Sequence, residues 1–187
     1  MDRRWPLLAR TLEDLGMWRH LPAAAAAEQA REVAAGGYPF RLLDADADVR
    51  WFFVDGEEMA EGRVPDQLRS MAPALLAHGV ELRFGADRVP SSTREDYVVT
   101  INGRPCRVWG PEDWTDYRAW ETATVRPLAV VNDLLGRAGA VPRLCTLYAG
   151  GNDGIAWLLD PRIVAAVERS GLLPAHEVPR LAADLDG

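Results

Sequence analysis

The chain has 187 residues, 48% of them hydrophobic, and a formal charge of −7 in which every positive side chain is an arginine. This length is enough for one sizeable core but hardly for two, so we expect a single domain over residues 1–187. The acidic balance and the absence of a concentrated basic stripe exclude a protein that binds nucleic acid through its phosphates.

No stretch approaches the roughly 18 to 20 apolar residues of a membrane span, so we expect no membrane partner. The first apolar stretch is interrupted by Arg10, Glu13 and Asp14, which argues against a signal peptide. Cys106 and Cys145 are too few for a disulfide framework, and no Cys or His spacing is typical of a structural zinc site. The sequence therefore predicts a cytoplasmic protein without metal or cofactor, in which both cysteines are packing residues.

The first part of the chain, about 1–37, is predicted to be helical. Apolar residues recur at intervals of three and four and indicate a helix that ends between Gly16 and Trp18. A second helix is expected over 23–35, where helix formers precede a pair of glycines. From about 38 to 175 the chain is expected to contain the sheet.

The middle of the chain alternates predicted strands and helices. We expect strands over 49–54 and 80–84, separated by a helix that begins near Pro65. Asn102-Gly103 suits a two-residue type I′ turn and predicts a hairpin of strands 97–101 and 104–109. Pro105 cannot donate a ladder hydrogen bond, so the second strand is expected to be an edge strand or to begin one residue late.

The last part is predicted to hold two further helices and a second hairpin. A short helix is expected over 111–120 and a longer one over 124–138, followed by strands 144–148 and 155–159. Asp160-Pro161 is a helix-start signal for a helix that stops at Gly171. Strands joined by hairpins predict an α+β fold, with an antiparallel or mixed sheet and helices packed on one face.

One segment has the composition of an interaction surface. Tryptophan, tyrosine and arginine are enriched in binding hot spots, and the segment is formed by Trp114, Asp116, Tyr117, Arg118 and Trp120. The three aromatic residues fall three apart, which would place them near one side of a short helix. Core packing is the commoner use of tryptophan, so a binding role is the second explanation for these residues.

The glycine-rich turn after the strand at 144–148 carries the other candidate site. Its glycines lack the Lys-Ser/Thr ending and the following helix of a phosphate loop, so a hairpin loop is the simpler interpretation. Tyr148, Asn152 and Asp153 are polar groups on this turn and are the catalytic candidates. A carboxylate or histidine from elsewhere in the fold would be needed to complete such a site.

Alternating aspartates before the first strand resemble the opening of a calcium loop. Asp44, Asp46 and Asp48 take the first ligand positions and Asp55 the last, but Val49 stands where the turn glycine is required. A solvated entry to the strand is the preferred interpretation, and no metal site is predicted.

Two functions remain after these observations. The first is a noncatalytic intracellular protein-binding domain that neutralises a basic partner, as a bacterial toxin-immunity protein does. It depends on the charge, on the Trp and Arg content and on the lack of a catalytic motif. The alternative is a small enzyme or ligand-binding protein with a pocket near the 148–154 turn, since acid–base sites are often assembled from residues scattered in sequence.

Overall fold

Two antiparallel sheets form the β part of the computed structural model, which describes residues 2–43, 49–85 and 89–183. The larger sheet has the order β1-β5-β4-β6, and the smaller is the β2–β3 hairpin. The strands are β1 (Trp51–Phe53), β2 (Tyr97–Ile101), β3 (Arg104–Trp109), β4 (Arg143–Leu147), β5 (Ile155–Leu159) and β6 (Arg180–Leu181). With the helices below, they confirm the predicted α+β class and the antiparallel pairing.

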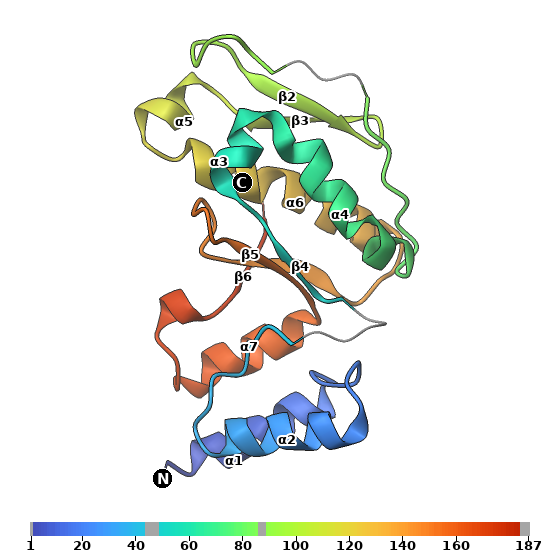
Figure 1. Cartoon of the computed structure of the whole chain (residues 1–187), viewed down its shortest axis with the longest axis vertical. Coiled ribbons are helices and arrows are strands. Elements are labelled where there is room, and N and C mark those ends of the chain that lie inside the picture. The colour runs from blue at the N-terminus through green and yellow to red at the C-terminus, as the bar shows by residue number, and fades with distance from the viewer. Residues whose placement is uncertain (1, 44–48, 86–88, 184–187) are drawn as a thin grey trace.

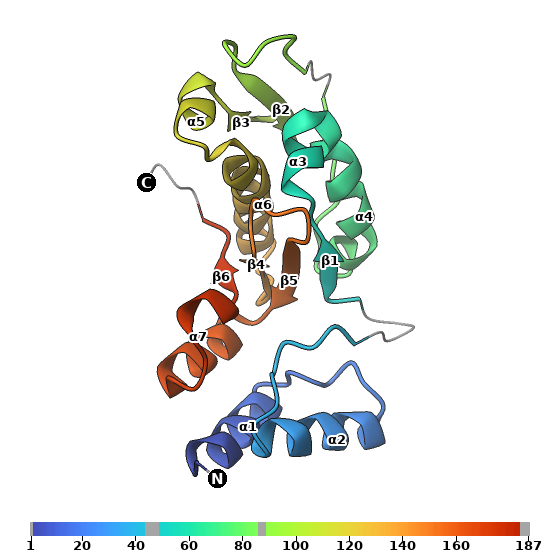
Figure 2. The same ribbon diagram turned by 60° about the vertical axis from the view of Figure 1, so that its left-hand side comes forward.

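The helices are distributed along the whole chain. They are α1 (Arg4–Asp14), α2 (Ala23–Ala34), α3 (Gly56–Glu58), the π-helical stretch η1 (Met59–Arg63), α4 (Val64–Leu76), α5 (Pro111–Thr115), α6 (Ala119–Arg137), α7 (Pro161–Ser170) and the 3-10 turn η2 (Ala175–Glu177). Figures 1 and 2 show α1 and α2 at one end of the molecule and the β2–β3 hairpin at the other, with the larger sheet and α6 between them. None of the described helices has the length and apolar character needed to cross a membrane.

Helices cover both faces of the larger sheet (Figure 1), whereas the sequence predicted them on one face. Ala156 and Leu158 pack into the core formed with α4 and α6. Trp157 and Leu159, which point to the other side, pack into the core formed with α1 and α7. The reason is that β5 is apolar at every position, so both of its faces need cover.

The predicted local signals at the hairpin turn and at α7 are confirmed. Asn102 and Gly103 have φ values of 50° and 77°, as a type I′ turn requires. Asp160 accepts a hydrogen bond from the backbone N–H of Arg162, with proline at the start of α7. Gly171 ends the helix in the left-handed region, at φ 59°.

The predicted strand at 80–84 is reduced to a single bridge between Phe84 and Ile101. The side chain of Asn102 makes hydrogen bonds to the backbone of 80–84 that a neighbouring strand would otherwise make. Its Oδ1 accepts from the backbone N–H of Arg83 at 2.7 Å, and its Nδ2 donates to the carbonyl of Glu81 at 2.9 Å. Side-chain bonds of this kind compete with regular pairing.

The predicted helix over 111–120 is in fact two helices, since α5 ends at Thr115 and α6 begins at Ala119. Tyr117 lies between them with φ 57°, outside the helical region. The three-residue spacing of aromatic residues therefore does not place them on one side of one helix. Further along, α6 continues through Pro127 and is longer than predicted.

Asp55, the last of the four aspartates compared with a calcium loop, caps α3. Its carboxylate accepts the backbone N–H of Glu58 at 3.0 Å, which is the ordinary role of aspartate before a helix. Asp44, Asp46 and Asp48 lie outside the described residues.

Candidate functional site

A buried ion pair organises the corner between α5 and α6. Asp113 is fully buried and Arg126 is 7% exposed, and their Oδ2 and Nη1 atoms are 2.6 Å apart. The same carboxylate accepts the backbone N–H of Gly110 at 2.8 Å, at the start of α5. Asp113 therefore joins the beginning of α5 to the second turn of α6.

Asp113 also contacts Arg118, which follows α5 in the chain. The backbone N–H of Arg118 donates to the carbonyl of Asp113 at 2.8 Å, and its guanidinium lies 3.8 Å from the Asp113 carboxylate. Tyr117, directly before it, is 97% exposed. The corner thus presents three consecutive exposed side chains, Asp116, Tyr117 and Arg118, which we call the 116–118 ridge.

The two tryptophans predicted to join this surface are half-buried against the core. Trp114 packs edge-on against Trp109, with ring centroids 5.5 Å apart. Trp120 lies against α3, where its Cβ would be 3.2 Å from a Cβ built on Gly56. Both indoles pack against the core beneath the α5–α6 corner. Of the predicted surface, only the 116–118 ridge faces solvent.

Several carboxylates lie near the start of α5. The guanidinium of Arg107 donates to two of them, Asp96 at 2.8 Å and Glu112 at 2.9 Å. Its hydrogen bonds lower the pKa of Glu112, which keeps that carboxylate ionised at neutral pH. Asp116 and Glu121 are exposed nearby in the chain.

The glycines of the 148–154 turn allow backbones to approach closely. The N–H of Gly56 donates to the carbonyl of Gly151 at 3.0 Å. A Cβ on Gly150, whose φ is 84°, would lie 2.9 Å from the backbone nitrogen of Glu121. The turn is therefore packed against both α3 and the start of α6, which explains its glycines without an anion.

Replacing Gly150 by alanine should destabilise the fold by about 2–4 kcal/mol, because left-handed strain adds to a backbone clash. Gly103 is the matched control, with φ 77° and nothing within 4 Å of a built Cβ. Its alanine variant has the strain alone, so we expect about 1–2 kcal/mol. Urea unfolding of both variants measures the difference, and equal losses would contradict the packing explanation.

The three catalytic candidates on this turn are separated by the structure. Tyr148 lines a cleft of about 370 Å³ beside α6, together with Thr146, Glu121, His176 and Arg180. Asn152 and Asp153 are exposed on the outer side of the turn and do not line it. Asn152 instead donates to the Glu57 carboxylate at 3.2 Å.

Sequence reasoning missed the residues that meet Tyr148 in this cleft. Arg180 and His176 come from the tail of the chain, which gave no signal. The sequence did contain a signal for Thr146, which is the only hydroxyl residue in the run Leu144–Leu147. A polar residue in a buried strand is unusual and therefore points to a candidate site.

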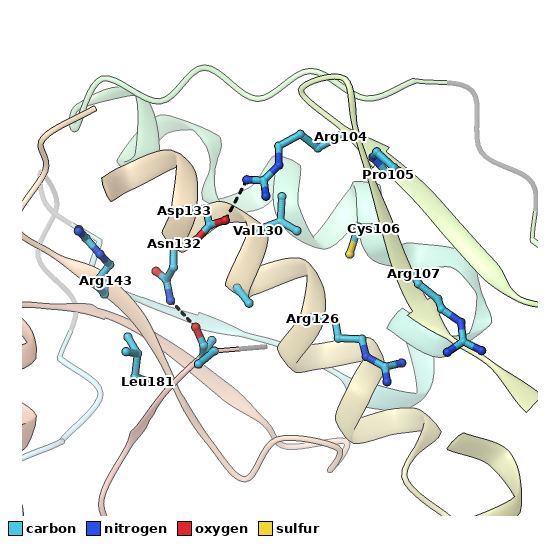
Figure 3. A pocket seen from close by; sticks show the side chains of 13 residues that line it. Arg104, Pro105, Cys106, Arg107, Arg126, Val130, Asn132, Asp133, Arg143 and Leu181 are labelled. Carbon is cyan, nitrogen blue, oxygen red and sulfur yellow. Dashed lines mark hydrogen bonds and ion pairs between the residues drawn. The ribbon is translucent and has the colours of Figure 1, made fainter. Parts of the chain in front are cut away.

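A second groove, of about 430 Å³, lies along α6 between β3 and β6 (Figure 3). Four arginines line it, but their described contacts are internal. Arg104 pairs with Asp133 at 3.0 Å, and Arg143 donates to the carbonyl of Ala140 at 2.7 Å. Arg107 and Arg126 reach the carboxylates around α5. The groove is therefore explained by packing and ion pairing.

Both cysteines are buried in the core, as predicted for packing residues. Burial raises the pKa of the Cys145 thiol to about 12, so the folded protein holds it as the unreactive neutral form. An unfolded thiol ionises near pH 8.5. The folded state therefore loses stability relative to the unfolded chain as the pH rises through this window.

Iodoacetamide should not label Cys145 in native protein at pH 8, because thiolate is scarce and the sulfur is covered. In a Cys106→Ala variant, labelling should follow the unfolding transition in urea. Mass spectrometry of the labelled peptide measures this, and rapid labelling without urea would contradict the burial.

The described residues contain no group of three His, Cys, Asp or Glu side chains placed to hold a metal ion. A scan against models of protein families gives no match, and searches of curated proteins and of solved structures give none either. A functional assignment therefore depends on the geometry of this chain's own residues.

Proposed function

We propose that this chain is a noncatalytic cytoplasmic protein-binding domain that neutralises a basic partner through the 116–118 ridge, as a bacterial toxin-immunity protein does. The observation that carries the proposal is Tyr117, an aromatic side chain almost wholly in water at a corner held by a buried ion pair.

Tyr117 contributes little to folding in its present position. A side chain that is 97% exposed gains almost no burial energy, and a positive φ of 57° is unfavourable for a non-glycine residue. Strain of this kind persists where surrounding structure holds it, and it clusters at binding sites. Tyrosine and arginine, which adjoin each other here, are enriched among hot-spot residues.

The charges near the ridge favour a basic partner. Asp116 and Glu121 are exposed on either side of Tyr117 and Arg118, and neither carboxylate forms an ion pair with a described residue. The chain as a whole has a net charge of −7. Such a field accelerates the approach of a positively charged protein and disfavours an acidic one.

The test is affinity capture from native cells by tagged wild-type protein and by a Tyr117→Gly variant. Glycine accepts the left-handed backbone, so this variant should keep its stability within about 1 kcal/mol. Its affinity for the captured partner should fall at least about 30-fold, as for a hot-spot residue.

Phe53→Ala is the matched control, because Phe53 is also aromatic and 59% exposed but lies on the edge strand β1. The proposal expects stoichiometric capture by the wild type and by this control. Equal capture by wild type and Tyr117→Gly, or no partner with abundant folded protein, would refute it.

A further inference from the structure

The cleft beside Tyr148 begins at a cross-strand pair. Thr146 of β4 stands directly opposite Arg180 of β6 in the antiparallel register. Residues paired in this way place their side chains on the same face of a sheet, about 5 Å apart at Cβ. Ala156, which faces Thr146 on the other side, belongs to the core under α6. The pair therefore faces the N-terminal half of α6.

Thr146 places a hydroxyl at the wall of the cleft. The residue is 6% exposed, and its hydroxyl makes no hydrogen bond with any described residue. The oxygen does not belong to the buried side-chain atoms that lack a partner, so solvent reaches it from the cleft. A ligand in the cleft would take the place of that water in the hydrogen bond.

Two opposite charges line the same cleft without neutralising each other. Arg180 enters from β6 and Glu121 from the first turn of α6. Neither forms an ion pair with a described residue, so they are not within 4 Å of each other or of another opposite charge there. This arrangement is complementary to a molecule that carries both a carboxylate and an ammonium group.

The rest of the cleft lining is largely apolar, and a hydrogen bond from Tyr38 holds one of its sides. Val125, Leu147, Ala149 and Val178 provide carbon surface. The hydroxyl of Tyr38 donates to the carbonyl of Glu177 at 2.8 Å and holds the η2 side of the cleft. The volume of about 370 Å³ is that of a small-ligand pocket.

We propose that this cleft binds a small zwitterion, an α-amino acid with an apolar side chain, whose carboxylate meets Arg180 and the Thr146 hydroxyl while its ammonium group meets Glu121. Tyr148 and His176 lie at the same cleft and add hydrogen-bonding groups. This site goes beyond the proposed function and involves none of the ridge residues, although the charge of Glu121 lies near both sites.

Calorimetric titration with L-leucine and two derivatives tests the charge complementarity. N-acetyl-L-leucine lacks the ammonium group and L-leucinamide lacks the carboxylate. The full-length protein should bind L-leucine more tightly than either derivative by about tenfold or more, since each loses a charge-assisted contact.

Two variants assign the contacts. Arg180→Gln should weaken L-leucine binding by about tenfold and leave L-leucinamide binding unchanged, because the amide never used the guanidinium. Glu121→Gln should have the mirrored effect, weakening L-leucine and sparing the N-acetyl derivative. Arg10→Gln, on the exposed side of α1, is the charge-matched control and should change neither.

Thr146→Val separates binding from folding. Removing a hydroxyl that makes no hydrogen bond with a described residue should leave stability nearly unchanged, whereas affinity for L-leucine should fall several-fold. No binding by the wild type at about 10 mM ligand, equal affinity for the three compounds, or variants that bind like the wild type would each overturn the proposal.

Discussion

An Asp113→Ala variant is expected to lose about 3–5 kcal/mol of its free energy of unfolding, the largest effect of any single side chain discussed. The change leaves the guanidinium of Arg126, which is 7% exposed, without the carboxylate 2.6 Å away. Removing one partner of a buried pair deprives the other charge of its closest counter-charge, which costs far more than the pair contributes. It also removes the acceptor for the N–H of Gly110.

Urea unfolding with a pair of controls distinguishes this explanation from a general effect of lost charge. Asp116→Ala, three residues away and exposed, should change stability by less than about 0.5 kcal/mol. A double variant, Asp113→Leu with Arg126→Met, should recover part of the loss because no charge remains buried. A loss below about 1 kcal/mol in Asp113→Ala would show that the pair does not hold the corner.

Asn132→Leu is expected to cost about 2–4 kcal/mol. The Asn132 side chain (labelled in Figure 3) joins α6 to the chain at β4 and β6. Its Nδ2 donates to the carbonyls of Leu144 and Ala182, each at 2.8 Å, and its Oδ1 accepts from Leu144 N–H at 2.6 Å. Leucine fits the space but leaves the N–H of Leu144 and the carbonyl of Ala182 unpaired. Each unsatisfied buried group costs about 1–3 kcal/mol.

In Asn132→Leu, structure should be lost at the β4–β6 contact before the whole protein unfolds. Hydrogen exchange should accelerate at Leu144 and Ala182, whose amides lie at the β4–β6 contact, while the β2–β3 hairpin keeps its protection. Asp133→Asn, the neighbouring exposed position, should cost less than about 1 kcal/mol, as a surface pair does. Unchanged exchange at Leu144 would contradict the role given to Asn132.

The Asp113–Arg126 pair and Asn132 each link α6 to one of the two proposed surfaces, the 116–118 ridge and the cleft beside Tyr148. Arg126 near the middle of α6 holds the ridge, and Asn132 in its second half holds β6, from which Arg180 reaches the cleft. Loosening Asn132 should therefore weaken the cleft and spare the ridge, and loosening Asp113 should do the reverse.

Local signals in the sequence were sufficient for most elements. Asn102-Gly103 and Asp160-Pro161 act through their own backbone preferences, so the hairpin and the start of α7 followed directly. Periodicity failed at 111–120 because α5 ends in a local backbone turn, in which the N–H of Arg118 donates to the carbonyl of Asp113 and Tyr117 takes the left-handed region. The bridge at Phe84 was overestimated as a strand because the side chain of Asn102 replaced the ladder.

The candidate surfaces were predictable only in part. Composition marked the segment that contains Tyr117, but the burial of Trp114 and Trp120 depends on what packs beneath them. The cleft brings Thr146 and Glu121 together with Arg180, separated by 34 and 59 residues in the chain, through strand pairing and helix docking. No local pattern carries that information.

Site-specific photo-crosslinking at position 117 in living native cells is the most direct test of the central claim that the ridge is the docking surface. A photoreactive phenylalanine analogue replaces Tyr117 in one strain and Phe53 in another. The account predicts one dominant basic protein crosslinked at position 117 and none at position 53. No crosslink at position 117, or the same products from both positions, would contradict it.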